Sequence, residues 1–231
     1  MEMKNKSFVI VMCILFACAL IGCANGDKIK IADVEDANVG DFIEYGVYEQ
    51  DNDKENGSED ILWRVIAKED NRVLVLSDKA IKCKPHKMKE EPVEWETSEI
   101  RTWLNEDFLK NAFDEEERKA IPETELTNAD NPLFGADGGN DTTDRIFLLS
   151  YDEVKEYLES EESRICYATE VAKQEDVHVA SSNGATWWWL RSQGYSKNRM
   201  MRVSATGIIS EVGDVNQSQK CGVRPAMWIE Y

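Results

Sequence analysis

The segment that most restricts the fold is the run Trp187-Trp188-Trp189, which opens a C-terminal block of short apolar stretches. On a strand, successive side chains point to opposite faces, so Trp187 and Trp189 would share one face while Trp188 occupies the other. Large rings on both faces cannot all enter one core, so each face needs its own cover. We expect Trp187 and Trp189 to be structural, with one face packed against a helix that carries Trp103.

Strands are predicted toward both ends of the chain, and helices between them. Alternation of apolar and polar residues indicates strands at 41–50, 61–69, 71–78 and 145–150, and again at 186–192, 199–205, 208–214 and 222–231. Helical spacing is found at 96–113, where Thr97 or Ser98 can cap the start, and at 114–121, 151–160 and 164–173, with a capping box at Ser150 and Glu153. This order predicts a single α+β domain in which N- and C-terminal strands form one antiparallel sheet around central helices.

The N-terminus has the pattern of an export signal. Lys4 and Lys6 precede the apolar run 8–21, which is short for a membrane-spanning helix. It ends in Leu20-Ile21-Gly22-Cys23, which resembles a bacterial lipobox. We expect a signal peptide at 1–22, a lipid on Cys23 that anchors the chain to the cell membrane from outside, a polar tether at 23–38 and a domain at 39–231. A transmembrane anchor with a chance cysteine is the alternative.

The net charge of the chain restricts the classes of molecule that it is expected to bind. The formal net charge is -18 and the sequence pI is about 4.6. Such a surface repels nucleic acid and anionic lipid, so neither is an expected partner. It is compatible with cationic ligands or divalent metal, although solubility alone also explains it.

Five phrases in order carry a resemblance: ILWRVI, TSEIRTWLNEDFL, TTDRIFLLSYDEVKEYL, WWLRS and GVRPAMWI. From Val39 to Tyr231 the chain resembles a domain of unknown function, DUF6273, which is found in secreted and surface proteins. The ending of that domain is similar to C-type-lectin-like folds, and among them to formylglycine-generating enzymes, so the resemblance implies a C-type-lectin-like single domain. Those enzymes hold copper with two C-terminal cysteines, whereas only Cys221 lies in that region here. Their activity is therefore not implied.

Two arginines stand in apolar strands, Arg191 and Arg224. A buried guanidinium without a partner is costly, so each is expected to pair with a carboxylate. Candidate partners are Asp144, Glu153 and Glu211. We assign Arg224 a structural role, whereas Arg191 is either structural or an anchor for a ligand carboxylate. An exposed ring beside Tyr195 would offer a stacking surface, so Trp188, Arg191 and Tyr195 form the predicted ligand-binding surface.

The segment 127–144 is rich in Asn, Asp and Gly and is predicted to be a long loop. Its oxygen ligands Asp137, Asn140, Asp141 and Asp144 suit Ca²⁺, which lectin-like domains often bind in a long loop. The spacing does not match an EF-hand, and a solvated acidic loop is the simpler interpretation.

Cys83, Cys166 and Cys221 remain after export, so at most one disulfide can form and its pairing is open. Cys83 and His86 lie close in sequence, but a zinc site needs two more ligands and a Cys-His nucleophile needs an orienting group.

The leading hypothesis is an extracytoplasmic, membrane-anchored binding module for a glycan or peptide. No motif of a serine hydrolase, zinc peptidase or P-loop enzyme occurs in the sequence. The alternatives are a cysteine-dependent enzyme that modifies envelope peptides, and a structural or assembly protein without a small ligand.

Overall fold

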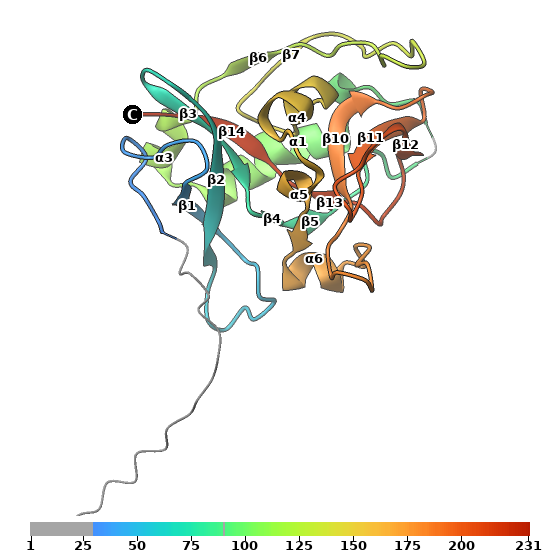
Figure 1. Cartoon of the computed structure of the whole chain (residues 1–231). Coiled ribbons are helices and arrows are strands. Elements are labelled where there is room, and N and C mark those ends of the chain that lie inside the picture. The colour runs from blue at the N-terminus through green and yellow to red at the C-terminus, as the bar shows by residue number, and fades with distance from the viewer. Residues whose placement is uncertain (1–29, 90) are drawn as a thin grey trace, which may run out of the picture.

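The computed structural model describes residues 30–89 and 91–231 and is an α+β structure whose sheets are mostly antiparallel (Figure 1). Two five-stranded sheets contain most of the strands of the described residues. The first has the order β1 (Phe42–Tyr48), β2 (Glu59–Glu69), β3 (Arg72–Ser77), β14 (Ala226–Glu230), β8 (Ile146–Phe147). The second has the order β12 (Ile209–Val215), β11 (Arg199–Val203), β10 (Trp188–Gln193), β13 (Gly222–Val223), β5 (Lys82–Cys83).

The two ends of the domain meet in the first sheet, as predicted. β14 pairs antiparallel with β3 and β8, so the last strand lies inside the sheet that β1 and β2 begin. The prediction of one common sheet is wrong for the tryptophan-rich strand, however, because β10 belongs to the second sheet. The predicted strand 222–231 is divided at Arg224-Pro225, and its two parts, β13 and β14, join different sheets.

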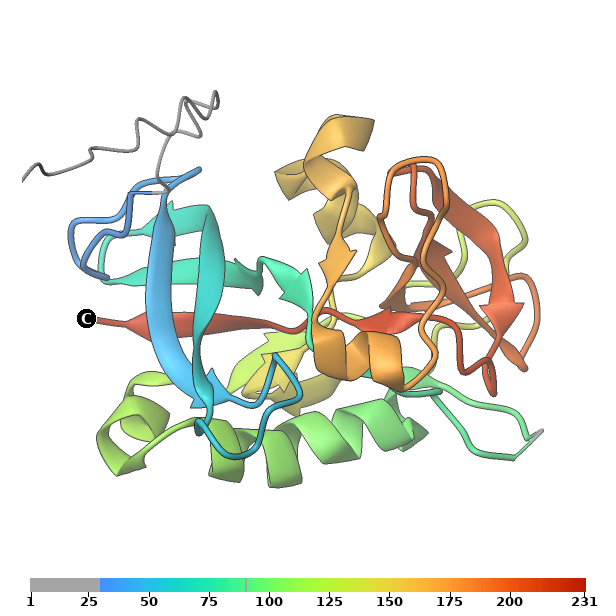
Figure 2. The same cartoon turned by 90° about the horizontal axis from the view of Figure 1, so that it is seen from below.

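Helices connect and cover the sheets. Figure 2 shows the helical segment made of α1 (Glu99–Trp103), a π-helical turn (Leu104–Phe108) and α2 (Leu109–Ala112) running beneath both sheets. α3 (Glu115–Ala120) follows it, and α4 (Tyr151–Tyr157), α5 (Glu161–Arg164) and α6 (Glu170–Gln174) come later in the chain. The first predicted helix is capped by Ser98, whose side chain accepts a hydrogen bond from the backbone N–H of Ile100. The predicted capping box of Ser150 and Glu153 starts α4.

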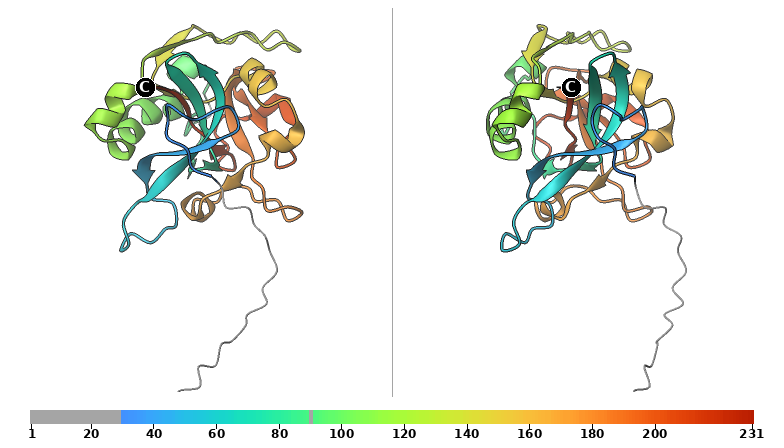
Figure 3. Two further views of the ribbon diagram at one scale, coloured as in Figure 1. Left: turned by 60° about the vertical axis from the view of Figure 1, so that its left-hand side comes forward. Right: turned by 90° about the vertical axis from the view of Figure 1, so that its left-hand side faces the viewer.

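The predicted loop 127–144 is part of a long hairpin. β6 (Thr124–Leu126) pairs antiparallel with β7 (Thr142–Asp144), and the hairpin crosses the top of the molecule in Figures 1 and 3. Its tip reaches the second sheet, where the side-chain amide of Asn131 donates to the carbonyl oxygens of Gln193 and Glu211. The hairpin, which leads directly into β8 of the first sheet, is therefore hydrogen-bonded to the second sheet.

The tryptophans of β10 lie mainly in the core. Trp188 and Trp189 have no exposed surface, while Trp187 is half-buried. The indole N–H of Trp188 donates to the carbonyl of Arg164 at 2.9 Å, and that of Trp189 donates to the carbonyl of Lys84 at 3.1 Å. Both indoles are therefore buried without losing a hydrogen bond, which burial of a polar group requires.

The side chains that pack against the tryptophans of β10 are not those that the sequence predicted. The ring of Trp189 meets the buried imidazole of His86 at 5.0 Å, and Trp187 stacks on His178 at 4.0 Å. The aromatic contacts of Trp103 in the described residues are with Tyr48 and Phe108, on the side of β1. The ring of Trp103 therefore packs beside the first sheet, and the predicted packing of Trp103 against the tryptophan strand is wrong.

Part of the predicted tether belongs to the folded domain. Ile31 bridges to Phe42, Ala37 is fully buried, and the Lys68 ammonium donates to the carbonyls of Glu35 and Ala37. The predicted signal peptide, Cys23 and the start of the tether lie outside the described residues. None of the helices in the part of the chain that the structure describes has the length and hydrophobicity of a membrane span.

Candidate functional site

A cleft of about 470 Å³ opens between β2, the turn that follows β3, and the segment carrying β9 (Tyr167–Ala168) and α6. We call it the β2–α6 cleft. It is lined by residues 50–51, 59–62, 77–79, 81, 167–170 and 173. The volume lies within the range of about 300 to 1,000 Å³ that is usual for small-ligand sites.

Backbone pairing fixes the walls of the cleft. β4 (Lys79–Ala80) pairs in parallel with β9, which sets Tyr167 opposite Lys79. Thr169 closes that wall, because its backbone N–H donates to Ala80 and its hydroxyl accepts from Ala172 to cap α6. On the other wall, the side-chain amide of Gln50 donates to the carbonyls of Glu59 and Asp60 in β2.

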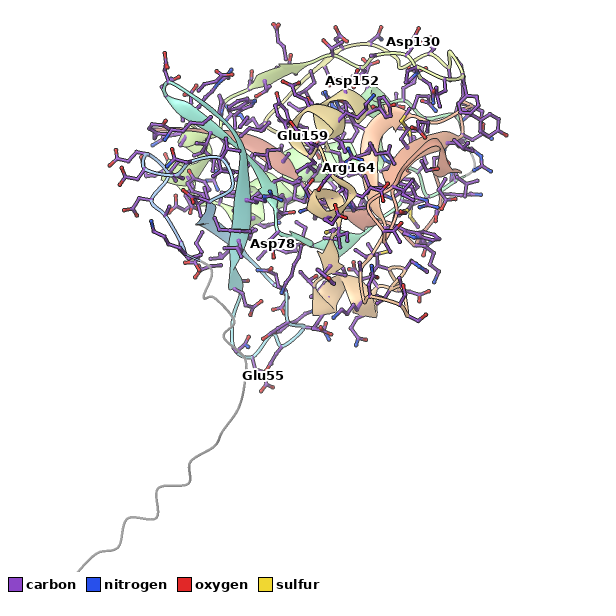
Figure 4. All side chains as sticks on the ribbon, in the orientation of Figure 1. Glu55, Asp78, Asp130, Asp152, Glu159 and Arg164 are labelled. Atoms are coloured by element: carbon purple, nitrogen blue, oxygen red, sulfur yellow. The ribbon has the colours of Figure 1, made fainter. Side chains whose placement is uncertain are left out.

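The floor of the cleft is apolar and its rim is polar. Ile61 and Ile81 are each 1 % exposed and form part of the floor. Tyr167 is 51 % exposed at the rim. The carboxylates of Asp60 and Asp78 make no hydrogen bond or ion pair with any residue that the structure describes. Figure 4 shows Asp78 on the face that also displays Asp152, Glu159 and Arg164.

Sequence patterns did not indicate this cleft. Tyr167 falls in a stretch predicted to be helical, whereas the structure divides that stretch into α5, β9 and α6. Asp78 and Asp60 belong to ordinary strand ends, and each is one of many carboxylates in an acidic chain. The backbone N–H of Asp78 donates to the carbonyl of Leu62, which holds Asp78 beside β2, and the pairing of β9 with β4 adds Tyr167 to the same cleft.

One group of carboxylates in the described residues is compact enough to hold a metal ion. The ligand atoms of Glu49, Asp51 and Glu59 lie within 4.8 Å of one another at the end of the cleft. Protein donors already occupy much of this group: Glu59 accepts from the backbone of Gln50 and Asp51, and a hydrogen bond from Asn56 lowers the pKa of Asp51. We therefore assign no metal to it.

The predicted calcium ligands do not form a common ligand set. Asp144 is 3 % exposed, and its carboxylate accepts from the Trp95 indole at 2.9 Å and from the Arg101 guanidinium at 2.7 Å. The other three have separate partners: Asp137 accepts from Gly139, Asp141 from Asn128, and Asn140 donates to Glu96. Asp144 therefore fixes the hairpin to the helix that begins at Glu99, and calcium at this loop is not supported.

Arg191 has the carboxylate partner that the sequence predicted. Its guanidinium is 3 % exposed and makes a two-point ion pair with Glu153, and it also donates to the carbonyl of Leu148 at 2.9 Å. The pair lies in the wall of a second cavity of about 340 Å³ between α4 and the β6–β7 hairpin. Because Glu153 satisfies the charge, the guanidinium of Arg191 needs no ligand carboxylate to balance it.

Arg224 has no such partner, so the predicted ion pair is wrong. The guanidinium is 3 % exposed, its Nε donates to the carbonyl of Ser77 at 2.9 Å, and it lies 5.1 Å from the ring of Trp188. No carboxylate lies within ion-pairing distance among the described residues. The indole face and the carbonyl dipole stabilise this charge instead.

The predicted ligand-binding surface is not formed as one surface. Trp188 has no exposed area, so its ring has no face for a ligand. Tyr195 is 48 % exposed, but its neighbours are Phe134 at 6.0 Å and Arg199 at 5.3 Å. Phe134 is carried by the long hairpin, and its meeting with Tyr195 is a tertiary contact that no local pattern announces.

Cys83, Cys166 and Cys221, the cysteines of the described residues, are free thiols with little tendency to ionise. Burial, followed by the negative charge of Glu175, raises the pKa of Cys83 to about 12. Burial also raises the pKa of Cys166 and Cys221. His86 is not paired with Cys83, since its Nδ1 hydrogen-bonds with the Ser98 hydroxyl at 2.9 Å, and complete burial lowers its pKa to about 3. The nucleophile of a cysteine enzyme is the thiolate, which these surroundings disfavour.

Searches of the curated proteins and of the solved structures found no match. A family model described as a domain of unknown function matches residues 70–231, from the turn between β2 and β3 through β14. The match covers more than half of the chain, and the chain therefore belongs to the DUF6273 family.

Proposed function

We propose that the chain is an extracytoplasmic, membrane-anchored binding module that holds a glycan or peptide in the β2–α6 cleft. The observation that carries this proposal is the combination of an apolar floor with rim side chains that have no protein partner. Asp60 and Tyr167 are exposed and Asp78 is half-buried, so a ligand can reach each of these side chains. A cleft that leaves Asp60, Asp78 and Tyr167 available offers both contact area and directional hydrogen bonds to a ligand.

The location rests on the N-terminal sequence, with its basic start, apolar run and lipobox-like Leu20-Ile21-Gly22-Cys23. A lipid on Cys23 would hold the domain outside the membrane, because acyl chains contribute about 0.8 kcal/mol per buried methylene. The test is fractionation of cells that express Cys23→Ser, with Cys18→Ser as the matched control. Release of Cys23→Ser alone supports the anchor, and retention of both variants at the membrane contradicts it.

We further propose a C-type-lectin-like fold. Two features support it: β14 lies beside β3 and β8, so both ends of the domain share a sheet, and the long β6–β7 hairpin crosses to the second sheet. A solved structure of this chain compared with lectin-like domains would test this.

Binding in the cleft is tested by comparing two exposed tyrosines. Tyr167 lies at the rim of the cleft, and Tyr195 lies on the surface that the sequence favoured; their exposed fractions are 51 % and 48 %. Ligands detected in a screen of envelope glycans and peptides should lose affinity with Tyr167→Ala and keep it with Tyr195→Ala. The reverse result would return the site to the second sheet.

A role in assembly is the second candidate. Leu133, Phe134 and Tyr195 are exposed apolar side chains at one end of the molecule, at 65 %, 49 % and 48 %. Exposed apolar residues that gather in this way often mark contacts with other proteins. The raised pKa values of the three thiols weigh against a cysteine-dependent enzyme.

A further inference from the structure

The side chains of the β2–α6 cleft also indicate which class of ligand it takes, an inference that rests on the proposed function. Several lining charges are already compensated. The carboxylate of Glu59 accepts two backbone N–H groups, and Glu170 pairs with Lys173 at 2.6 Å. Among the described residues, the rim groups that remain without partners are the carboxylates of Asp60 and Asp78, the ammonium of Lys79 and the hydroxyl of Tyr167.

The backbone of the cleft has little to offer a peptide. Peptides commonly bind by adding a strand, which needs free N–H and C=O groups along an edge. Here Gln50 occupies the carbonyls of Glu59 and Asp60, while Thr169 and Val171 donate their backbone N–H groups to Ala80 and Gln50. Recognition in this cleft must therefore come from side chains.

The remaining side chains suit hydroxyl groups. An ionised carboxylate only accepts hydrogen bonds and can accept from two neighbouring donors, which matches adjacent hydroxyls of a sugar. The half-exposed ring of Tyr167 offers an apolar face beside them. An anionic ligand would meet the unpaired charges of Asp60 and Asp78, which one lysine does not offset.

We propose that the cleft binds a glycan without acidic groups, a neutral or amine-bearing sugar chain, with one ring against Tyr167 and its hydroxyls donating to Asp60 and Asp78. The contact with the ring of Tyr167 and the hydrogen bonds accepted by the two carboxylates then involve the same sugar residue. The bound chain follows the open side of the cleft.

The test is calorimetric titration of the full chain with hexamers of N-acetylglucosamine, glucose, glucosamine and galacturonate, and with a lysine-containing hexapeptide. At least one neutral or amine-bearing hexamer should bind, and the galacturonate hexamer should bind at least about tenfold more weakly. Asp78→Asn should weaken sugar binding about tenfold, because a charge-assisted hydrogen bond is lost. Tyr167→Ala should weaken it by a factor of about three to ten, and Tyr167→Phe by less than about threefold.

Asp70→Asn, an exposed aspartate in the turn between β2 and β3, is the matched control and should leave binding unchanged. The thermal unfolding midpoint of each variant verifies that it is folded. If only the peptide binds and Tyr167→Ala abolishes that binding, the sugar assignment is overturned while the proposed binding module stands. Equal binding of galacturonate and the neutral hexamers also overturns it. If a sugar binds and every cleft variant retains full affinity, the cleft itself is wrong as the site.

Discussion

The Arg191–Glu153 pair gives the sharpest prediction about stability. Arg191 is 3 % exposed, and the side chain of Glu153 is 22 % exposed. Glu153→Ala would leave the guanidinium with the carbonyls of Leu148 and Thr127 as acceptors, and no carboxylate. It would also remove the acceptor of the Ser150 backbone N–H at 2.7 Å, which belongs to the cap of α4.

The magnitude follows from these two losses. Removing one partner of a buried pair costs about 3 to 5 kcal/mol, and the part of Glu153 that water reaches favours the lower end. The lost cap adds about 0.5 to 1 kcal/mol. We expect Glu153→Ala to lower the free energy of unfolding by about 3 to 4 kcal/mol, and Glu153→Gln by about 2 kcal/mol, because the amide oxygen still accepts from Ser150.

Urea unfolding followed by tryptophan fluorescence measures this loss. With a slope of about 2 kcal/mol per molar urea, the midpoint of Glu153→Ala should fall by about 1.5 to 2 M. Glu156→Ala, an exposed carboxylate on the same helix, should shift the free energy by less than about 0.5 kcal/mol. A double variant, Arg191→Met with Glu153→Leu, should be more stable than Glu153→Ala alone, because no unpaired charge remains buried. If Glu153→Ala and Glu156→Ala unfold at the same midpoint, the pair does not stabilise the fold.

Three further predictions concern other parts of the molecule. The folded-state pKa of His86 is depressed to about 3, so on acidification the unfolded chain binds the proton first. The free energy of unfolding should therefore fall by up to about 1.4 kcal/mol per pH unit as the pH drops from 6.5 toward 3. The same pH titration of His86→Phe should be flatter. Gly207→Ala should destabilise the fold by more than about 2 kcal/mol, because φ is +83° and a Cβ would lie 1.9 Å from the carbonyl oxygen of Glu161. In the same unfolding assay Gly57→Ala should cost about 1 kcal/mol, because its φ is +96° but no atom lies within 4 Å of the added Cβ. Because its pKa is raised, Cys83 should react with a thiol probe at pH 8 at least about tenfold more slowly in the folded chain than in the urea-unfolded chain. Equal rates would support the hypothesis of a cysteine-dependent enzyme.

The parts of the fold that sequence predicted correctly are local ones. The strands β1, β2 and β3 and the caps at Ser98 and Ser150 depend on periodicity and on side chains within four residues, so they can be recognised without tertiary information. The single strand predicted at 222–231, in contrast, is wrong, because Pro225 separates β13 from β14.

The parts that were missed depend on contacts far apart in the chain. β5 and β9 are two residues long, too short for any period, and exist because β13 and β4 pair with them. The division into two sheets follows from the choice of strand partners, which alternation does not encode. Burial of Arg224 against an indole could not be distinguished from an ion pair, because both place an arginine in an apolar strand.

The same holds for the candidate site. The sequence predicted the site on the tryptophan strand because aromatic residues are concentrated there. Rings of that size are buried in the core, so they are not available to a ligand. The cleft is lined instead by side chains of ordinary appearance, such as Asp78 and Tyr167, that β4–β9 pairing brings to one opening.

The position of β14 has a consequence for biogenesis. Its neighbours β3 and β8 are synthesised well before it, and they pair with it on both sides. The nascent polypeptide therefore cannot complete its first sheet until the segment 226–230 has emerged, and long-range closure of this kind is slow. A chain that stays incompletely folded until the segment 226–230 arrives is compatible with the export that we propose, in which the polypeptide would cross the membrane before it folds.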